Sequence, residues 1–240
     1  LERGITRLLF RKLDLGVALA VPSMYDALWF EARKVAVVPN GIPDPCPDCE
    51  TRVLPRRLAR PVRRLLYLAH CTREKGIFDT LEALAIYNSR HPDQPLQLTA
   101  AGAFLEEAEE REFHERIARP DLREAVTYAG FVHGDEKQRL LEECDALCFP
   151  TYYRAEGQPV NVIEAMAFGL PVVTTRWRAI PEILPEDYPL SVPPKSPEKM
   201  ADAFGKIGTL RLEARLREEF VRRFTLSAHL GQLAASLKKV

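Results

Sequence analysis

The chain has 240 residues, of which 46% are hydrophobic and 28% charged, the composition of an ordinary globular protein. Lysine and arginine total 34, as do aspartate and glutamate, so the zero net charge gives no support for nucleic-acid binding or for a broad contact with an anionic membrane. No apolar run approaches the roughly 18–20 residues of a membrane helix, and no signal peptide is visible.

The first part of the chain predicts a small strand–helix–strand unit. Residues 15–21 (LGVALAV) and 35–40 (VAVVPN) have the apolar character of short strands. Ser23 is a suitable N-cap for a helix over residues 23–33 between them. Residues 42–61 are rich in proline and arginine and have no clear periodicity, which is typical of a linker.

The linker contains a C-x-x-C motif, Cys46 and Cys49, and the chain has three further cysteines. No second C-x-x-C or H-x-x-x-H is present to complete a zinc site. A thioredoxin-like motif should lie at a helix N-terminus after a strand, whereas a loop is expected here. The odd total argues against a disulfide framework, so we expect free thiols in a reduced compartment.

From residue 65 onward the pattern alternates between strands and helices. Strands are predicted at residues 65–70, 96–101, 126–128, 146–149 and 171–174, and helices at residues 76–89, 105–118 and 136–144, from about Pro159, and in two or three pieces beyond Pro197. Such alternation predicts an α/β fold with a doubly wound parallel sheet. Ligands of these sheets bind beyond the carboxyl ends of the strands.

The segment RAEGQPVNVIEAMAFGLPVVTT (154–175) carries the strongest functional signal. It places Glu156 and Glu164 around the start of an almost wholly apolar helix, where Glu164 needs a specific partner. Pro159 suits the first helical position, and the free N–H groups that follow form an anion site. A nucleotide diphosphate sugar has matching hydroxyls, pyrophosphate and ribose diol.

A simpler interpretation exists for each glutamate on its own. A glutamate near a helix N-terminus is usually a capping or dipole feature, and one inside a helix usually points to solvent. The apolar surroundings of Glu164 and the strand-like PVVTT that follows favour the ligand-binding interpretation.

Five segments together resemble the retaining, nucleotide-sugar-dependent glycosyltransferases of family 4, which have the GT-B fold. They are VVPNGI (37–42), LLYLAHCTREKGIFDTLEAL (65–84), YAGFVHGDEKQRLLEECDALCFPT (128–151), the E-x7-E segment EGQPVNVIEAMAFGLPVVTT, and AIPEIL (179–184). The resemblance spans roughly residues 35–185 in order. It implies that the chain is the C-terminal, Rossmann-like half of a GT-B enzyme with a remnant of its N-terminal domain.

The resemblance also implies a role for each matching position. Lys75 matches the lysine that contacts the donor diphosphate, Glu156 the glutamate that contacts the transferred sugar, and Glu164 the one that binds the ribose. Glu156 and Lys75 are thus the catalytic candidates. The remaining donor-binding candidates are His70, Arg73, Phe131, Val132, Gly157, Gln158, Pro159, Val160 and Asn161. Backbone around Phe131 and Val132 would contact the base.

One departure from the family pattern concerns the second phosphate cation. The family often has Gly-Arg five residues before the lysine, where this chain has Ala69 and His70. Arg73 or His70 are the candidates to replace that cation, and a neutral strand-end role for His70 is the simpler alternative.

The domain organisation implied by the resemblance has four parts. Residues 1–40 would be a remnant of the acceptor domain, 41–64 a linker, 65–225 the donor domain, and 226–240 a helix that crosses back to the acceptor domain. Because the chain begins with Leu1 rather than methionine, we expect an upstream part that holds the acceptor site. The isolated chain would then bind nucleotide weakly and transfer no sugar.

The implied partners are a nucleotide sugar donor and a glycan or lipid-linked acceptor in polysaccharide biosynthesis. No D-x-D motif is visible near the E-x7-E segment, so neither a metal nor another cofactor is expected. The implied location is the cytoplasm, with a peripheral contact to the inner face of the membrane left open. Two alternatives stay open: a catalytically inactive nucleotide-binding or scaffold domain, and a GT-B-fold nucleotide-sugar epimerase.

Overall fold

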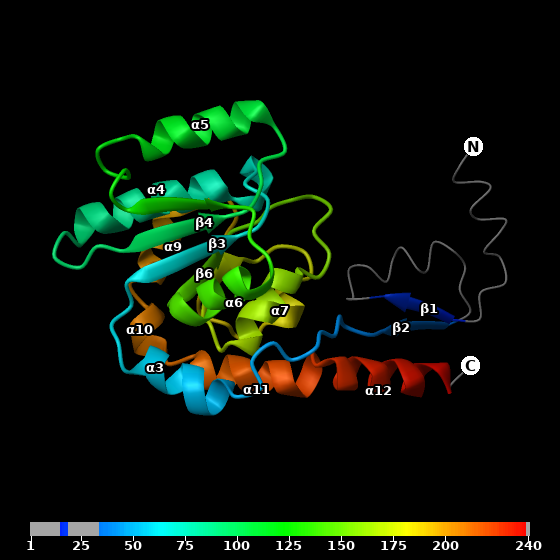
Figure 1. Cartoon of the computed structure of the whole chain (residues 1–240). Helices are drawn as coiled ribbons and strands as arrows, with labels where there is room; N and C mark the ends of the chain where they lie inside the picture. Colours follow the sequence, from blue (N-terminus) through cyan, green and yellow to red (C-terminus); the bar gives the residue numbers. More distant parts are fainter. Residues whose placement is uncertain (1–14, 19–33, 239–240) are drawn as a thin grey trace, which may run out of the picture.

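The structure, a computed structural model, describes residues 15–18 and 34–238 and is dominated by a six-stranded parallel sheet (Figure 1). Its strands are β3 (Arg64–Leu68), β4 (Gln97–Ala101), β5 (Val126–Gly130), β6 (Ala146–Phe149), β7 (Val172–Thr175) and β8 (Ser191–Val192). Their order is β5-β4-β3-β6-β7-β8, and every neighbouring pair is parallel. This confirms the predicted doubly wound α/β fold.

Helices cover both faces of this sheet. The helices that follow β3 along the chain are α4 (Ile77–Arg90), α5 (Glu107–Ile117), α6 (Gly134–Glu143), α7 (Val160–Ala167), α8 (Ile180–Ile183), α9 (Pro197–Phe204), α10 (Ile207–Leu210), α11 (Glu213–Arg223) and α12 (Leu226–Leu237). Figure 1 shows α4 and α9 on one face and α6 and α7 on the other, and α4 packs against α9 as α7 packs against α11. The two or three helical pieces expected at the C-terminal end are four in the structure.

The central strands are apolar on both faces because both faces are covered. All side chains of β6 and β7 are buried, as are Leu65, Leu66, Tyr67 and Leu68 in β3. Chain order reverses between β3 and β6, which is the point where open α/β sheets bind ligands beyond the carboxyl ends of their strands.

Two further strands form a separate parallel pair. These are β1 (Leu15–Ala18) and β2 (Lys34–Val37), which agree with the strands predicted at residues 15–21 and 35–40 as far as the structure describes them. The helix predicted over residues 23–33 lies outside the described residues.

The predicted linker has more structure than the sequence indicated. It contains a π-helical turn η1 (Cys49–Val53) that continues into α3 (Leu54–Leu58), so the expected loop is present at residues 46–48 and ends at Cys49. Buried Arg57 holds this segment to the sheet layers by donating to backbone carbonyls of Leu141, Cys144 and Phe168. The cysteines of the described residues are buried free thiols.

The last helix is unlike the others. In Figure 1, α12 continues beyond α11 and extends away from the sheet toward β1 and β2. No residue of α12 is buried, and Leu226, Leu230 and Leu237 are 42%, 53% and 58% exposed. Within the described part of the chain, no helix is both long and apolar enough to cross a membrane.

Candidate functional site

The candidate site lies at the carboxyl ends of β3 and β6, where two hollows adjoin. The Lys75 hollow has a volume of about 240 Å³ and is lined by Leu68, Ala69, His70, Lys75, Phe149, Glu156, Pro159, Val160 and Asn161. The Phe131 hollow has a volume of about 280 Å³ and is lined by Leu68, Ala69, His70, Ala101, Gly102, Phe131, Val132, His133 and Lys137. The two share the end of β3, so together they form one extended surface.

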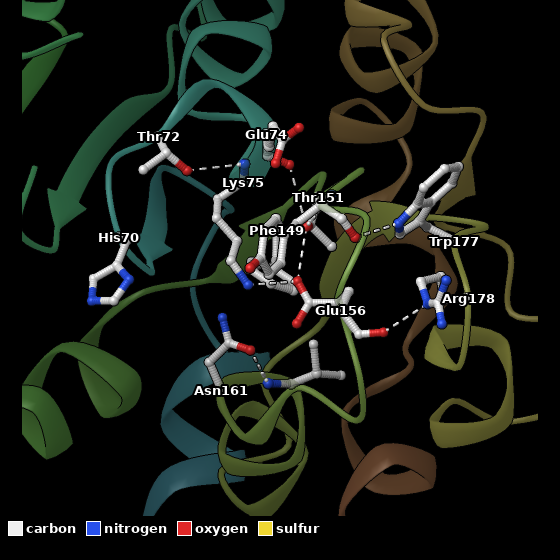
Figure 2. Close-up of polar contacts among 12 residues, drawn as sticks. His70, Thr72, Glu74, Lys75, Phe149, Thr151, Glu156, Asn161, Trp177 and Arg178 are labelled. Atoms are coloured by element: carbon white, nitrogen blue, oxygen red, sulfur yellow. Dashed lines mark hydrogen bonds and ion pairs between the residues drawn. The ribbon is translucent and has the colours of Figure 1, made fainter. Parts of the chain in front are cut away.

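Glu156 is the buried carboxylate of the Lys75 hollow. Its side chain is 7% exposed, and its Oε2 accepts hydrogen bonds from Lys75 Nζ at 2.7 Å and Thr151 Oγ1 at 2.8 Å. The side chains of Lys75 and Thr151 converge on it in Figure 2. The backbone carbonyl of Glu156 accepts from Arg178 Nε at 3.1 Å, which fixes the loop that carries it.

Lys75 reaches this carboxylate from a tight turn after β3. Thr72 caps the 3-10 turn η2 (Arg73–Lys75), and Gly76 ends it with φ = 86°, a left-handed conformation that glycine adopts at little cost. The ammonium lies 4.7 Å from the ring centroid of Tyr153, within range for a cation–π contact. Lys75 therefore presents a fixed positive charge to the hollow.

The N-terminus of α7 forms the floor of the Lys75 hollow. The sequence predicted Pro159 at the first helical position, whereas it occupies the N-cap position. The eight-residue helix therefore begins one residue later, at Val160. The Asn161 side chain donates to Leu68 O at 2.7 Å, which fastens the helix start to the end of β3. First-turn N–H groups and the helix dipole favour an anion here.

Glu164 lies one turn further along α7 and has the partner that its apolar surroundings require. Its Oε1 is 2.6 Å from Lys137 Nζ, on α6, and the two side chains are 19% and 31% exposed. The sequence predicted that Glu164 needs a partner and did not identify Lys137. The sequence feature that could have identified it is its position one turn inside α6, because this helix is expected to start at the same edge of the sheet.

The two residues considered as a second phosphate cation lie in different places. His70 lines both hollows, and its carbonyl accepts from the Tyr67 hydroxyl at 2.7 Å. Burial raises the pKa of Tyr67 well above its ordinary value, so its hydroxyl stays a donor. The Arg73 guanidinium pairs with Glu112 and lies over the Phe78 ring, and Arg73 lines neither hollow.

The remaining candidates differ in whether they line the two hollows. Phe131 is 68% exposed and Val132 is buried, so Phe131 offers an open aromatic ring beside the backbone. Gln158 lines neither hollow, and its side-chain oxygen accepts from Asn40 N at 2.5 Å. Gly157 has open space where a side chain would begin. Among the described residues, no group of three or more His, Cys, Asp or Glu side chains is placed to hold a metal ion.

Comparison with known families identifies one model that covers most of this sheet. The model described as glycosyl transferases group 1 matches residues 62–208, more than half of the chain. The matched region includes both hollows and both glutamates.

Several curated proteins are similar to the chain. The amylovoran biosynthesis glycosyltransferase AmsK of Erwinia amylovora is 31% identical over 162 residues, which is 66% of this chain and 38% of that protein. The putative colanic acid biosynthesis glycosyltransferase WcaL of Escherichia coli K12 is 29% identical over 143 residues, 57% of this chain and 34% of that protein. The chain thus spans between a third and two fifths of the length of these relatives.

Solved structures share the fold. Anabaena Alr3699/HepE in complex with UDP has a TM-score of 0.81 at 19% identity, covering 99% of this chain and 67% of that one. Sucrose-phosphate synthase of Thermosynechococcus elongatus has a TM-score of 0.72 at 21% identity, covering 99% of this chain and 61% of that one.

Proposed function

Because the chain belongs to the group 1 glycosyltransferases, we propose that it supplies the donor-binding half of a GT-B enzyme that transfers a sugar from a nucleotide diphosphate sugar to a glycan or lipid-linked acceptor. One observation carries the proposal: the Lys75–Glu156 pair lies against the N-terminus of α7, at the point where the strand order reverses. A cation, a helix N-terminus and a buried carboxylate then meet in one hollow.

The parts of the donor are assigned by chemistry. The diphosphate takes Lys75 and the first turn of α7, because both offer positive charge. Glu156 accepts hydroxyls of the transferred sugar, and Glu164 accepts those of the ribose. The base occupies the Phe131 hollow, against the backbone around Val132.

In the proposed reaction, the bond between the anomeric carbon and the diphosphate oxygen breaks, and the acceptor hydroxyl oxygen bonds to the anomeric carbon while its proton passes to the departing diphosphate. Lys75 and the α7 N-terminus stabilise the charge that develops on the departing diphosphate, which is the main electrostatic task of such a site. These groups supply positive charge without a resident metal in our proposal. Glu156 orients the sugar, and transfer retains the anomeric configuration.

The relatives suggest the type of donor and of pathway. HepE has been solved with UDP and with UDP-glucose, which makes these two ligands the first probes to use. AmsK is named for amylovoran biosynthesis and WcaL, as a putative enzyme, for colanic acid biosynthesis, and these names favour a growing glycan on a lipid carrier as the acceptor in our proposal. Such an acceptor would place the protein in the cytoplasm, at the inner face of the membrane.

Calorimetric titration of the 240-residue chain with UDP, GDP, ADP and UDP-glucose tests the proposal. We expect one nucleotide to bind and Lys75→Met to weaken it about tenfold, the effect of losing one charge-assisted phosphate contact. Circular dichroism establishes that the chain and the variant are folded. A folded chain that binds none of these ligands would refute donor binding and favour a scaffold.

A further inference from the structure

The ion pair between Lys137 and Glu164 links the two helices that flank the ligand edge of the sheet. Lys137 lies in α6, which precedes β6, and Glu164 lies in α7, which follows β6. The Nζ–Oε1 distance is 2.6 Å, and both side chains are partly buried. A fully exposed ion pair contributes little to stability, but this one is partly buried and is a charge-assisted hydrogen bond.

Lys137 places the pair at the Phe131 hollow, and Glu164 itself lines neither hollow. Lys137 lines the Phe131 hollow, whereas Asn161 lines the Lys75 hollow. Asn161 and Glu164 are three residues apart on α7 and therefore share a face of the helix. The Glu164 carboxylate is thus bound to a residue of the proposed base hollow and lies on the same helix face as a residue of the proposed diphosphate hollow, and the ribose joins these two parts of the donor.

We propose that Lys137 is the positioning residue that holds Glu164 toward the ribose and thereby sets the preference of the site for ribonucleotides over their deoxy forms. The inference rests on the proposed function. A carboxylate has about four lone-pair sites. Lys137 occupies one of them on Oε1, which orients the group and leaves the others to accept the two ribose hydroxyls.

Among the described residues, Lys137 is the charged side chain that pairs with Glu164. His133 also lines the Phe131 hollow, and the centroid of its ring lies 6.0 Å from the centroid of the Phe131 ring. The acidic residues of the first α6 turn, Asp135 and Glu136, are exposed and carry the wrong charge for this task.

The test compares UDP with 2′,3′-dideoxy-UDP, each titrated into the unsubstituted chain, Lys137→Met and Lys137→Arg. We expect the unsubstituted chain to prefer UDP by about tenfold or more, because hydroxyls that donate to a charged acceptor make strong hydrogen bonds. In Lys137→Met this preference should fall to about twofold or less, with UDP losing affinity and the dideoxy form losing little. Lys137→Arg restores the cation and should keep most of the preference.

Arg139→Met provides a matched control, because Arg139 is an exposed cation two residues along α6 that lines neither hollow. It should leave both affinities unchanged. Equal losses of UDP and the dideoxy form in Lys137→Met would overturn the inference, since a general structural role or a direct contact to base or phosphate predicts that result. If the unsubstituted chain binds neither UDP, GDP nor ADP, the proposed function and this inference fail together.

Discussion

At the scale of single residues, Lys75 pairs with Glu156 in the structure and binds the diphosphate in our proposal. Its ammonium lies 2.7 Å from Glu156, so a diphosphate that uses Lys75 must compete with a carboxylate. The transferred sugar, in contrast, needs that carboxylate as an acceptor. Free nucleotide and nucleotide sugar should therefore respond oppositely when Glu156 loses its charge.

We expect Glu156→Gln to bind UDP about threefold more tightly and UDP-glucose about tenfold less tightly than the unsubstituted chain. Glutamine keeps the shape of the side chain and an oxygen for the Thr151 hydroxyl. Calorimetry with both ligands gives the two changes. Glu164→Ala is the comparison, because loss of the ribose contact should weaken both ligands. A Glu156→Gln variant that weakens UDP and UDP-glucose equally would contradict this division of roles.

Gly76 is the residue that allows Lys75 to reach the hollow. Its φ is 86°, and a Cβ placed there would lie 2.6 Å from atoms of Pro150. We expect Gly76→Ala to lower the free energy of unfolding by about 2–4 kcal/mol through backbone strain and overpacking. Urea unfolding followed by circular dichroism measures it.

Gly231→Ala is the matched control for this measurement. Gly231 lies in the exposed helix α12, and a Cβ there meets nothing within 4 Å. Alanine is the better helix former by about 0.5–1 kcal/mol, so this variant should be slightly more stable. A Gly76→Ala protein as stable as the unsubstituted chain would show that the turn can adopt another conformation.

At the scale of elements, Arg217 of α11 ties three segments together. The side chain is 4% exposed and pairs with Asp44 at 2.7 Å and Glu50 at 2.8 Å. It also donates to Ala167 O, at the end of α7, at 3.0 Å. The segment predicted as a linker is thereby fixed to the helix that carries Glu164.

We expect Arg217→Met to lower the free energy of unfolding by about 2–4 kcal/mol, because it leaves the partly buried Asp44 carboxylate and the carbonyl of Ala167 without their partner. Arg222→Met, on the same helix, removes an exposed pair with Glu219 and should cost less than about 0.5 kcal/mol. Urea unfolding at neutral pH compares the two variants. Equal changes in the free energy of unfolding for the two variants would show that the buried position of Arg217 does not strengthen its ion pairs.

The same network makes a prediction about pH. Burial raises the pKa of Asp44, but the hydrogen bonds from Arg217 and from Cys46 N lower it more, so its pKa lies below the ordinary 3.8. The stabilisation by Asp44 is therefore complete above pH 3.8 and is lost as the pH falls through the lower folded-state value. The difference in free energy of unfolding between the unsubstituted chain and Arg217→Met should therefore become smaller below about pH 4. A difference that stays constant between pH 6 and pH 3 would contradict this.

Elements with a regular apolar pattern were predictable from the sequence, and those fixed by distant contacts were not. The strands at residues 65–70 and 146–149 are continuous apolar runs, so the sheet followed from them. The helical segment over residues 49–58 has no such run and depends on Arg57 and Arg217 reaching carbonyls and carboxylates elsewhere. For the same reason Glu164 was predicted as a site residue, whereas its partner Lys137 was not.

At the scale of the whole molecule, the chain is shorter than its relatives and leaves one apolar helix uncovered. The chain covers 38% of AmsK and 34% of WcaL. Helix α12 is largely apolar, yet it has no buried residue and exposes three leucines. An apolar helix normally packs against another surface. We propose that an acceptor domain covers it, as expected for the segment that crosses back from the donor domain.

This division leads to a prediction for the isolated chain. The described hollows hold groups for a base, a ribose, a diphosphate and a sugar, and we place the acceptor site in the domain that α12 would contact. The 240-residue chain should therefore bind UDP-glucose, or the corresponding donor, without transferring its sugar. Incubation with radiolabelled UDP-glucose and a lipid extract measures both events, by filter binding and by label in the lipid fraction. The comparison is a protein in which this chain is joined to the proposed acceptor domain, and it should label the lipid. Transfer by the 240-residue chain alone would show that its own residues complete the acceptor site.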